Sequence, residues 1–480
     1  MIVYHAAQGP AVKLFAGAAL ILSLAACGAG GSPLSPLNSA QGAASATSSY
    51  LIVHSFQGLP DGYVPTSALV SDNLGRLYGV TDYGGSTPRG CNGSTGCGTF
   101  FAFDPSSRQE TVLYSFGRTR GDGQLPNSLL FYDGSFYGTT EDGGTNASLG
   151  TVFKITPPDR RGGNWNETIL HRFRGSPNDA ASPTQLTIDA SGIIYGTAAD
   201  GGSATKCFQG CGAIFRLTPP SGKGKWQETI LHSFAGVPDG TAPSGLILAP
   251  NRTFYGETGA GGRSTACGSA RGCGTIFALK PSRGSRWTET IVHSFRAGGA
   301  PKDDGEFPFG GLVLTSNGAL YGVAVYGGPL QQCYTQGYPW SGCGTFFRLK
   351  PTPGKQRAWT ESILYLFKGG ASDGARPDAI VSERNGYYGT TVEGGGGYCE
   401  RGAGCGTLFA LVPSRRNMVW TETIAHAFTG GTNDGWDPNG SVVVDRKGLY
   451  GVTMYGGSGP CSFGCGTIYE YQPKAKESNP

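Results

Sequence analysis

The sequence predicts an all-β fold, a seven-bladed β-propeller of four-stranded antiparallel blades in which an N-terminal strand closes the last blade. Three observations lead to this prediction. One unit recurs seven times over residues 50–473, each copy contains four short strand signals, and the strand missing from the last copy precedes the first. Stacked repeats bury a continuous core, and a closed ring leaves no exposed sheet edge where it begins and ends.

The repeat is defined by landmarks in a fixed order. A Phe closes a segment of the type Glu-Thr-Ile-x-His-x-Phe, at Phe56, Phe116, Phe173, Phe234, Phe295, Phe367 and Phe428. An Asp with a Pro four residues later follows, at Asp61, Asp122, Asp179, Asp239, Asp304, Asp373 and Asp434. A Tyr-Gly pair, a Gly-Gly pair and a run like that at 274–281 complete each copy. Copies that match one another within one chain indicate one repeated structural unit.

Four strands are expected in each unit, and we name them a, b, c and d in chain order. In the fourth copy they are 245–249, 253–258, 274–280 and 287–295. Each is short, rich in β-branched or aromatic residues, and bounded by Gly, Pro, Asn or Ser. Pairs such as Asn317-Gly318 between strands a and b are typical of tight hairpins. No stretch keeps a helical period long enough to predict a helix.

The chain ends favour a closed ring over an open β-solenoid. The segment Tyr50–Phe56 is a d strand with no unit before it, and the last unit ends near residue 473 without a d strand of its own. We therefore expect Tyr50–Phe56 to pair with the sheet formed by residues 440–472.

The repeated unit, with its His-Ser-Phe, Asp-Gly-x-x-Pro, Tyr-Gly and Gly-Gly landmarks, resembles the GloVer tandem repeat of the "choice-of-anchor" bacterial surface proteins. The resemblance covers residues 50–473. It implies an envelope or secreted protein that is anchored in one of several ways, and it implies no particular activity. The double Gly is also similar, more loosely, to that of kelch propellers.

The N-terminus predicts export and a lipid anchor. Residues 14–26 form an apolar run that is too short to span a bilayer but suits a signal peptide. Leu24-Ala25-Ala26-Cys27 resembles a bacterial lipobox, which implies lipidation of Cys27, and Gly28 favours the outer membrane. Ordinary secretion is the alternative. The predicted layout is a signal peptide at 1–26, a lipidated flexible tether at 27–49, the propeller at 50–473 and a tail at 474–480.

Composition excludes several classes of protein. The chain has 82 Gly in 480 residues without a three-residue period, so it is not collagen-like. Its net charge of +4 gives no basic stripe, which argues against a nucleic-acid partner.

Twelve of the 13 cysteines fall in local pairs, and in an exported protein these predict disulfides. The pairs are Cys91–Cys97, Cys207–Cys211, Cys267–Cys273, Cys333–Cys343, Cys399–Cys405 and Cys461–Cys465. Each lies in a loop between strands b and c, and the second unit lacks both cysteines. Zinc binding is the alternative, but two thiolates in one loop are half of a tetrahedral site.

Function is expected on one face. Because strands alternate in direction, the b–c loops and the d–a loops emerge together, and loops on a rigid scaffold commonly carry binding. The seven Asp of the repeat could hold Ca²⁺ there, although Asp-Gly before Pro is also ordinary turn chemistry. The His at the x-His-x-Phe position (54, 171, 232, 293 and 426) shares a face with buried residues, so we expect it to pack between blades. No other cofactor is expected.

Two further sets of residues are candidates. Aromatic side chains that depart from the repeat could stack on sugars or grip a partner: Tyr326, Tyr334, Tyr338, Trp340 and Trp436. Carboxylates at the ends of b strands could supply an acid/base pair: Glu141, Asp142, Asp200, Glu257 and Glu393.

The sequence therefore favours a lipid-anchored envelope protein that binds an extracellular polysaccharide or a surface protein through its loop face. The alternatives are a propeller glycoside hydrolase or polysaccharide lyase, and a passive envelope scaffold. Apart from the lipid, no membrane contact is expected.

Overall fold

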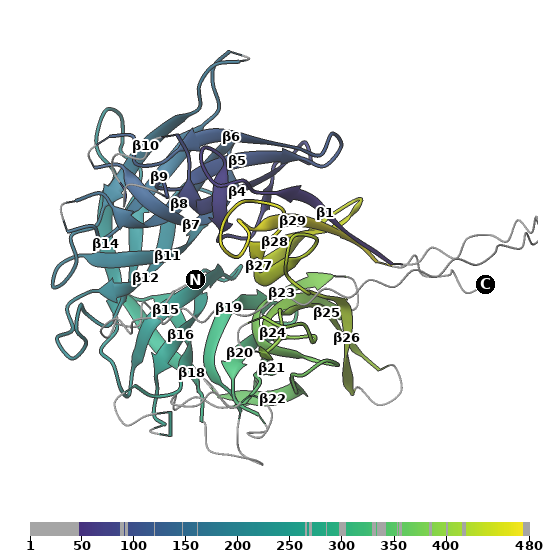
Figure 1. Cartoon of the computed structure of the whole chain (residues 1–480). Coiled ribbons are helices and arrows are strands. Elements are labelled where there is room, and N and C mark those ends of the chain that lie inside the picture. Colours follow the sequence, from purple (N-terminus) through teal and green to yellow (C-terminus); the bar gives the residue numbers. More distant parts are fainter. Residues whose placement is uncertain are drawn as a thin grey trace, which may run out of the picture.

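The computed structural model is an all-β ring of seven antiparallel sheets (Figure 1). It describes residues 48–473 except 87–90, 92–94, 120, 146, 161, 265, 268–270, 285, 297–303, 329–332, 334–341, 353, 355–357, 384–385, 400–401 and 415–418. The signal peptide, the Cys27 anchor, the tether before residue 48 and the tail after residue 473 lie outside the described residues, as do Tyr334, Tyr338 and Trp340.

The first four blades follow chain order. Blade one contains β2 (Gly62–Pro65), β3 (Val70–Ser71), β4 (Leu77–Gly84), β5 (Thr99–Asp104) and β6 (Gln109–Ser115). Blade two contains β7 (Gly123–Tyr132), β8 (Ser135–Gly143), β9 (Thr151–Thr156) and β10 (Asn166–Arg172). Blade three contains β11 (Ala180–Ile188), β12 (Ile194–Gly201), β13 (Ala213–Thr218) and β14 (Gln227–Ser233). Blade four contains β15 (Gly240–Leu248), β16 (Phe254–Gly261), β17 (Thr275–Pro281) and β18 (Trp287–Ser294).

The remaining blades complete the ring. Blade five contains β19 (Glu306–Leu314), β20 (Leu320–Tyr326), β21 (Thr345–Pro351) and β22 (Trp359–Leu366). Blade six contains β23 (Gly374–Glu383), β24 (Gly386–Gly394), β25 (Thr407–Pro413) and β26 (Trp420–Ala427). Blade seven contains β27 (Gly435–Asp445), β28 (Gly448–Gly456), β29 (Thr467–Gln472) and β1 (Ser49–Ser55).

The predicted closure is confirmed. Strand β1 pairs antiparallel with β29, with Ser49 opposite Gln472 and Ser55 opposite Thr467. In Figure 1 the purple start of the chain lies against its yellow end. The Tyr50 ring also stacks on His426 of blade six, with 3.4 Å between ring centroids. The first strand therefore completes blade seven and contacts blade six as well.

Strand a starts earlier in the structure than the sequence pattern predicts. In blade four the sequence suggests a turn up to residue 244, but β15 starts at Gly240, which pairs with Gly261. The Asp-Gly-x-x-Pro segment is thus the first part of the strand, with a bulge between Pro243 and Gly245. A bulge lets one strand continue through residues whose alternation is broken, which is why the pattern looked like a turn.

The core lies between neighbouring blades. The Phe that closes each d strand packs edge-on against an aromatic ring on strand c of the next blade, as Phe56 does on Phe101 at 5.2 Å. The same contact recurs at Phe116–Phe153, Phe173–Phe215, Phe234–Phe277, Phe295–Phe347, Phe367–Phe409 and Phe428–Tyr469. These landmark Phe side chains are fully buried. The landmark Phe of each repeat therefore packs neighbouring blades against each other, so the repeat determines contacts between blades as well as within one blade.

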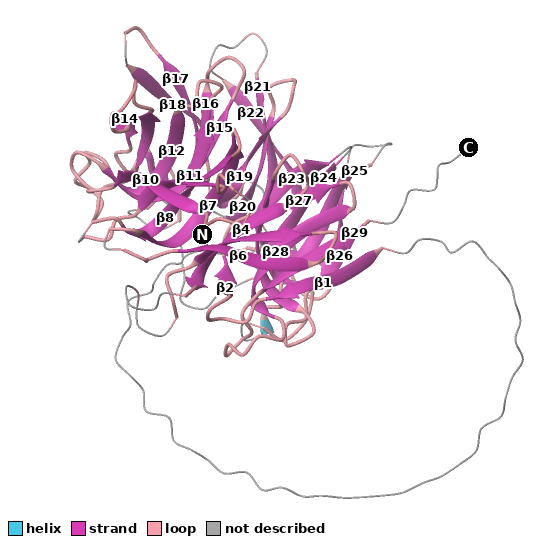
Figure 2. Ribbon diagram, turned by 90° about the horizontal axis from the view of Figure 1, so that it is seen from above, coloured by secondary structure: helices cyan, strands magenta, loops and turns pink. Residues whose placement is uncertain are grey.

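Strands and loops make up nearly all of the described chain (Figure 2). In that part of the chain, no helix has the length and apolar character that a membrane span needs.

Candidate functional site

The b–c loops and d–a loops meet on one face, which we call the loop face. All six predicted disulfides are present in its b–c loops. The carbonyl of the second Cys in each loop accepts the N–H of a residue at the start of the next blade, as Cys465 does from Val64 at 3.1 Å. In blade two, which has no disulfide, the carbonyl of Leu149 takes this role for Ser182. The loops of one blade are thus attached to the next blade.

The residues that donate these bonds are in the left-handed backbone region. They occupy the position before Pro in the Asp-Gly-x-x-Pro segment, and their φ values lie between 51° and 57°. They are Val64, Leu125, Ser182, Ala242, Phe307, Arg376 and Asp437. Such a conformation is unfavourable for residues other than Gly, and it persists where surrounding bonds fix it. Seven copies of it set the shape of the loop face.

The double Gly of each repeat has a geometric cause. The N–H of Gly85 donates to the carbonyl of Asp61 at 3.0 Å, and the same bond between the second Gly and the Asp recurs in five other repeats. Gly84 has a φ of +96°, and a Cβ on it would overlap the Asp61 carbonyl oxygen. Only Gly fits where the b strand passes this close to the d–a loop.

Three aromatic side chains are strongly exposed on this face. Among the described residues, the exposed large aromatic side chains are Phe208, Tyr398 and Phe463, at 98%, 90% and 64% exposure. Phe208 lies between Cys207 and Cys211, Phe463 lies between Cys461 and Cys465, and Tyr398 precedes Cys399. Phe208 and Phe463 therefore stand inside segments closed by disulfides, and Tyr398 stands directly beside one. The sequence patterns did not single them out, although Phe208 and Phe463 stand inside the predicted Cys pairs.

Of the predicted aromatic candidates, Trp436 and Tyr326 are described. Trp436 is half-buried beside the exposed Phe463, at 5.6 Å between ring centroids, and beside Tyr455 at 5.1 Å. Tyr326 lies under the guanidinium of Arg376, 5.4 Å from its ring centroid. Trp436 thus extends the aromatic surface of the Phe463 loop, whereas Tyr326 belongs to a separate cluster in blade five.

The central channel has a cavity of about 310 Å³ lined by the a strands of all seven blades. Polar side chains there bond to the backbone of the next blade. Thr66 donates to the carbonyl of Pro126 at 3.1 Å, Asn127 to that of Pro183 at 2.9 Å, and Asn439 to that of Thr66 at 3.3 Å. These side chains connect neighbouring blades around the axis.

Three of the predicted carboxylates lie in separate blades. Glu257 is fully buried and accepts the N–H of Gly311 from blade five at 2.6 Å, and burial raises its pKa to about 7. Glu393 forms an ion pair with Arg376 at 2.7 Å. Burial raises the pKa of Asp200. These three side chains occupy blades four, six and three.

One acid that the sequence patterns did not reveal lies beside Glu141 and Asp142. Asp82 accepts a hydrogen bond at 2.9 Å from Thr66, which lines the channel. Burial raises the pKa of Asp82 to about 7, and the negative charges of Glu141 and Asp142 add to this effect. The Asp-Tyr-Gly-Gly sequence that begins at Asp82 aligns with the Glu-Asp-Gly-Gly sequence of blade two. This alignment is the sequence feature that could have added Asp82 to the candidate carboxylates.

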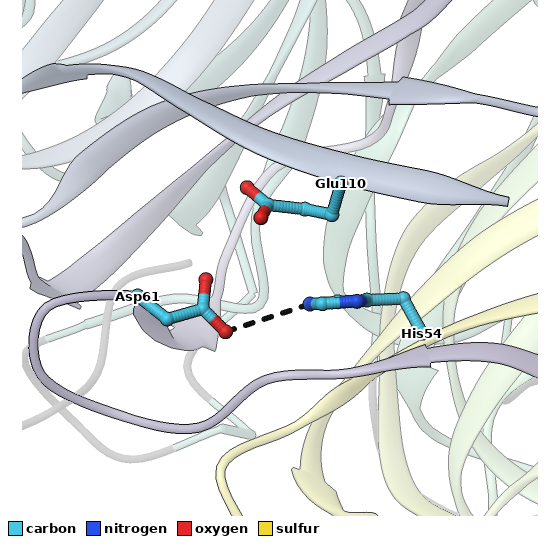
Figure 3. A group of neighbouring side chains, drawn as sticks. All are labelled: His54, Asp61 and Glu110. Carbon is cyan, nitrogen blue, oxygen red and sulfur yellow. Dashed lines mark ion pairs between the residues drawn. The ribbon is translucent and has the colours of Figure 1, made fainter.

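The predicted His and Asp residues meet at the blade junctions. In Figure 3, His54 of β1 in blade seven points to Asp61, and Glu110 of β6 in blade one faces both. The His54 Nε2 to Asp61 Oδ2 distance is 3.5 Å. The prediction that the His side chains pack between blades agrees with this placement.

Seven junctions share this arrangement, which we call the clasp. It joins a His or Tyr of one d strand, the Asp of the following d–a loop, and a Glu or Tyr of the next d strand. The other six are Tyr114–Asp122–Glu167, His171–Asp179–Glu228, His232–Asp239–Glu289, His293–Asp304–Glu361, Tyr365–Asp373–Glu422 and His426–Asp434–Tyr50.

The Asp of each clasp also has a structural role in its loop. The carboxylate of Asp61 accepts the N–H of Gln57 at 2.9 Å and that of Gly62 at 2.7 Å, and Asp122 and Asp179 do the same in their loops. None of the candidate metal groups among the described residues contains two of the seven Asp. Since Ca²⁺ takes six to eight oxygen ligands, this placement favours the turn role, and Ca²⁺ binding stays a prediction.

Four clasps offer a His, an Asp and a Glu with ligand atoms within 4.8 Å, so a metal ion must be considered. The other three replace one member by Tyr. Tyr50 donates to Asp434 at 2.8 Å in the place of the Glu, and Tyr365 donates to Asp373 at 2.7 Å in the place of the His. In all seven, a side chain that can donate a hydrogen bond faces the Asp, and a phenol can donate as well as an imidazole can. The donor set therefore fits a hydrogen-bonded clasp better than a metal site.

The six clasp Glu side chains have raised pKa values. One oxygen of each of the six is buried and accepts no hydrogen bond. Burial is the main cause that raises their pKa values to between about 7 and about 9, and the neighbouring Asp adds to it. A protonated carboxyl can share its proton with an adjacent carboxylate, which avoids placing two negative charges side by side.

The family can now be stated. Residues 42–208 and 168–399 match the family described as the Gloeobacter/Verrucomicrobia repeat. The chain belongs to this repeat family. The GloVer resemblance suggested by the sequence is thereby confirmed. No curated protein matches the chain.

Solved structures with a similar arrangement include three bacterial proteins. One is described as an oxidoreductase (glucose dehydrogenase) from Thermus thermophilus: 13% identity, TM-score 0.40, covering 88% of this chain and 100% of that one. The PQQ-bound aldose sugar dehydrogenase of Streptomyces coelicolor has 13% identity and a TM-score of 0.39, with 89% and 99% covered. A gluconolactonase from Xanthomonas campestris has 12% identity and a TM-score of 0.36, with 71% and 86% covered.

Proposed function

We propose that this chain is an exported recognition module that binds an extracellular carbohydrate polymer through its loop face. One observation carries the proposal: Phe208, Tyr398 and Phe463 are exposed on that face, within or directly beside disulfide bridges. Leaving a large aromatic ring in water forgoes roughly 2 kcal/mol of burial, so such side chains indicate a contact surface.

The arrangement favours a polymer over a small ligand. The three exposed rings belong to blades three, six and seven, so no single compact pocket holds them. Flat rings held by short cystine loops lose little entropy on binding and stack on the apolar faces of sugars. Trp436 beside Phe463 enlarges one of these contact points.

We further propose an envelope location, with a lipid on Cys27 as the anchor. Six disulfides suggest an extracellular or envelope protein. Ser49 and Gln472 lie opposite each other at the end of blade seven remote from its cystine loop, so a tether before Ser49 would leave that loop unobstructed. Metabolic labelling with a fatty-acid analogue tests the anchor: label is expected on the wild-type chain and not on Cys27→Ser, and equal labelling of both would contradict it.

The test of recognition uses the full chain carrying Cys27→Ser, so that it stays soluble, against a glycan panel. Replacing Phe208, Tyr398 and Phe463 by Ser is expected to weaken binding of the recognised glycan at least tenfold. The matched control is Leu74→Ser, which removes an 86% exposed apolar side chain from the turn at the other end of strands a and b. Absence of glycan binding, or an equal loss in the control, would contradict the proposal.

An enzyme is the second candidate, and Asp82 is the observation that favours it. A carboxyl that keeps a proton near neutral pH beside other carboxylates suits general acid catalysis. Shortening of the bound polysaccharide, lost in Asp82→Asn, would favour a hydrolase or lyase. Binding without shortening favours the recognition module.

A further inference from the structure

The cavity in the central channel has one charged residue in its wall. Its volume of about 310 Å³ is sufficient for a small organic molecule. Among the described residues that line it, Asp378 of β23 is the one acidic residue, and none is Lys, Arg or His. A buried carboxylate is costly unless it is paired, so the wall of the cavity offers a negative charge that it does not itself compensate.

Asp378 has one carboxylate oxygen that accepts a hydrogen bond and one that does not. Its Oδ2 accepts the N–H of Gly440 from blade seven at 2.6 Å. No described residue donates a hydrogen bond to Oδ1, although Asp378 as a whole is only 8% exposed. The second oxygen is therefore free to bind a ligand in the cavity.

Blade five interrupts a ring of hydrogen bonds around the channel axis. In five other blades, the residue after the Pro of the Asp-Gly-x-x-Pro segment bonds to the backbone of the next blade: Thr66, Asn127, Thr184, Asp378 and Asn439. In blade five this residue is Phe309, which lines the cavity. Its ring packs on Phe307, with 6.0 Å between centroids, and stays partly exposed. An aromatic ring cannot make such a bond, but its face attracts a cation.

Two glycines bring the walls of neighbouring blades together at Asp378. A Cβ on Gly310 would overlap the Asp378 carbonyl oxygen, so the residue that follows Phe309 touches Asp378. On the other side, Gly440 donates to Asp378, and a Cβ on it would lie 3.0 Å from the backbone nitrogen of Ala68 in blade one. Both glycines have a positive φ, which glycine adopts without strain. The a strands of blades five, six, seven and one thus meet around this carboxylate.

A serine of the same wall lacks a hydrogen-bond partner. Ser67, which precedes Ala68, lines the cavity and is 6% exposed. Its buried Oγ makes no hydrogen bond among the described residues, which costs free energy. The equivalent residue of blade two, Ser128, shares a hydrogen bond with Thr139 at 2.6 Å. Ser67 therefore retains a hydroxyl with which a ligand in the cavity can form a hydrogen bond.

A second carboxylate adds to the negative potential near Asp378. Glu257 is fully buried, and its Oε2 has no hydrogen-bond partner among the described residues. Burial raises the pKa of Glu257 to about 7, and the negative charge of Asp378 adds to this effect. A positive charge beside Asp378 would therefore be favoured by both carboxylates.

We propose that this cavity binds a small organic ammonium ion, with its charge between the Asp378 carboxylate, the Phe309 ring and the Ser67 hydroxyl. The positive charge pairs with the carboxylate, and the apolar carbons pack on the ring. A Ca²⁺ ion takes six to eight oxygen ligands, whereas this lining supplies one carboxylate. The site goes beyond the proposed function, because it holds a small molecule in the channel rather than a polymer on the loop face.

The experiment measures affinity by calorimetry with the full Cys27→Ser chain and four probes: choline, ethanolamine, calcium chloride and dimethylbutanol, the neutral isostere of choline with carbon in place of nitrogen. We expect one of the two ammonium ions to bind, and dimethylbutanol to bind at least tenfold more weakly. Asp378→Asn, which can still accept the N–H of Gly440, should weaken ammonium binding at least tenfold.

Two serines provide a matched pair of variants. Ser67→Ala should weaken ammonium binding severalfold, because it removes a hydroxyl without a partner in the protein. Ser128→Ala is the control and should not change it, since Thr139 keeps Asn127 as a partner. Thermal unfolding checks that each variant is folded, and Phe309→Leu, also expected to weaken binding, is the second test if Asp378→Asn is not.

The outcomes distinguish this site from the alternatives. Tighter binding of choline assigns it to quaternary ammonium ions, and tighter binding of ethanolamine to primary ones. No binding of either, equal binding of dimethylbutanol, displacement by Ca²⁺, or unchanged affinity in the folded Asp378 and Phe309 variants would overturn the proposal. Ammonium binding should be unaffected when Phe208, Tyr398 and Phe463 are replaced by Ser, so this site and the loop face are tested separately.

Discussion

At the scale of single residues, glycines and left-handed residues fix the loop face. The Gly84 and Gly85 pair lets the b strand touch the Asp61 carbonyl, and Val64 holds its unfavourable φ because it donates to Cys465. These positions carry the loops on which the exposed aromatics stand. A change at them is expected to act on both stability and recognition.

Alanine substitutions at two glycines separate the effect of steric contact from that of backbone strain. Gly84→Ala should lower the free energy of unfolding by roughly 3 kcal/mol or more, because its Cβ meets backbone while φ is positive. Gly75→Ala has a similar φ of +82° but nothing within 4 Å of the new Cβ, so roughly 1 kcal/mol is expected. Urea unfolding measures both. Equal losses would show that the close approach of Gly84 does not matter.

At the scale of elements, the sequence predicts the number of strands and the cysteine pairs well, because both are local patterns. Strands c and d of blade four begin within one residue of their expected starts. Strand a was expected to start at 245 and starts at Gly240, since the left-handed Ala242 and the bulge break the alternation that marks a strand. The propeller tolerates this break because the loop of the neighbouring blade accepts the N–H of the left-handed residue, as the Cys211 carbonyl does from Ala242.

The site was less predictable than the strands for a physical reason. Exposure depends on what surrounds a side chain, and the repeat pattern alone could not show that Phe208 is exposed while Phe215, seven residues later, is buried. Asp82 was missed because its neighbours Glu141 and Asp142 come from the next blade. The clasp partners likewise lie on different d strands. The pKa values and hydrogen-bond partners of these side chains therefore depend on contacts between blades rather than within one blade.

At the scale of the whole molecule, the clasps link ring stability to pH. Burial raises the pKa values of six Glu side chains to between about 7 and about 9 in the folded state, whereas in the unfolded chain they ionise around their ordinary value of 4.5. Between those values the folded state binds more protons than the unfolded state. Stability from these groups is therefore complete below about pH 4.5 and is lost as pH rises toward 7 to 9.

Other groups in the clasps act in the opposite direction at low pH. Burial alone would raise the pKa of Asp179, Asp239 and Asp434, but hydrogen bonds from His171, His232 and His426 and from backbone N–H groups lower it. Their contribution is lost as pH falls through the lowered pKa values. The ring is thus expected to be most stable in mildly acidic solution.

Glu110→Gln tests this coupling at one clasp. Burial, followed by Asp61, raises the pKa of Glu110 to about 8, so ionisation of its unfolded form favours unfolding above pH 4.5. Gln stays neutral in both states and still offers a donor to Asp61. We expect the variant to match the wild type within about 0.5 kcal/mol at pH 5 and to be more stable by about 1–2 kcal/mol at pH 8, a discounted value because the side chain is partly exposed. Thermal unfolding at both pH values measures it, with Asp133→Asn in an exposed turn as control. A gain that is the same at pH 5 and pH 8 would mean that the clasp does not hold its proton, and the sevenfold recurrence of His or Tyr, Asp, and Glu or Tyr would then need another cause.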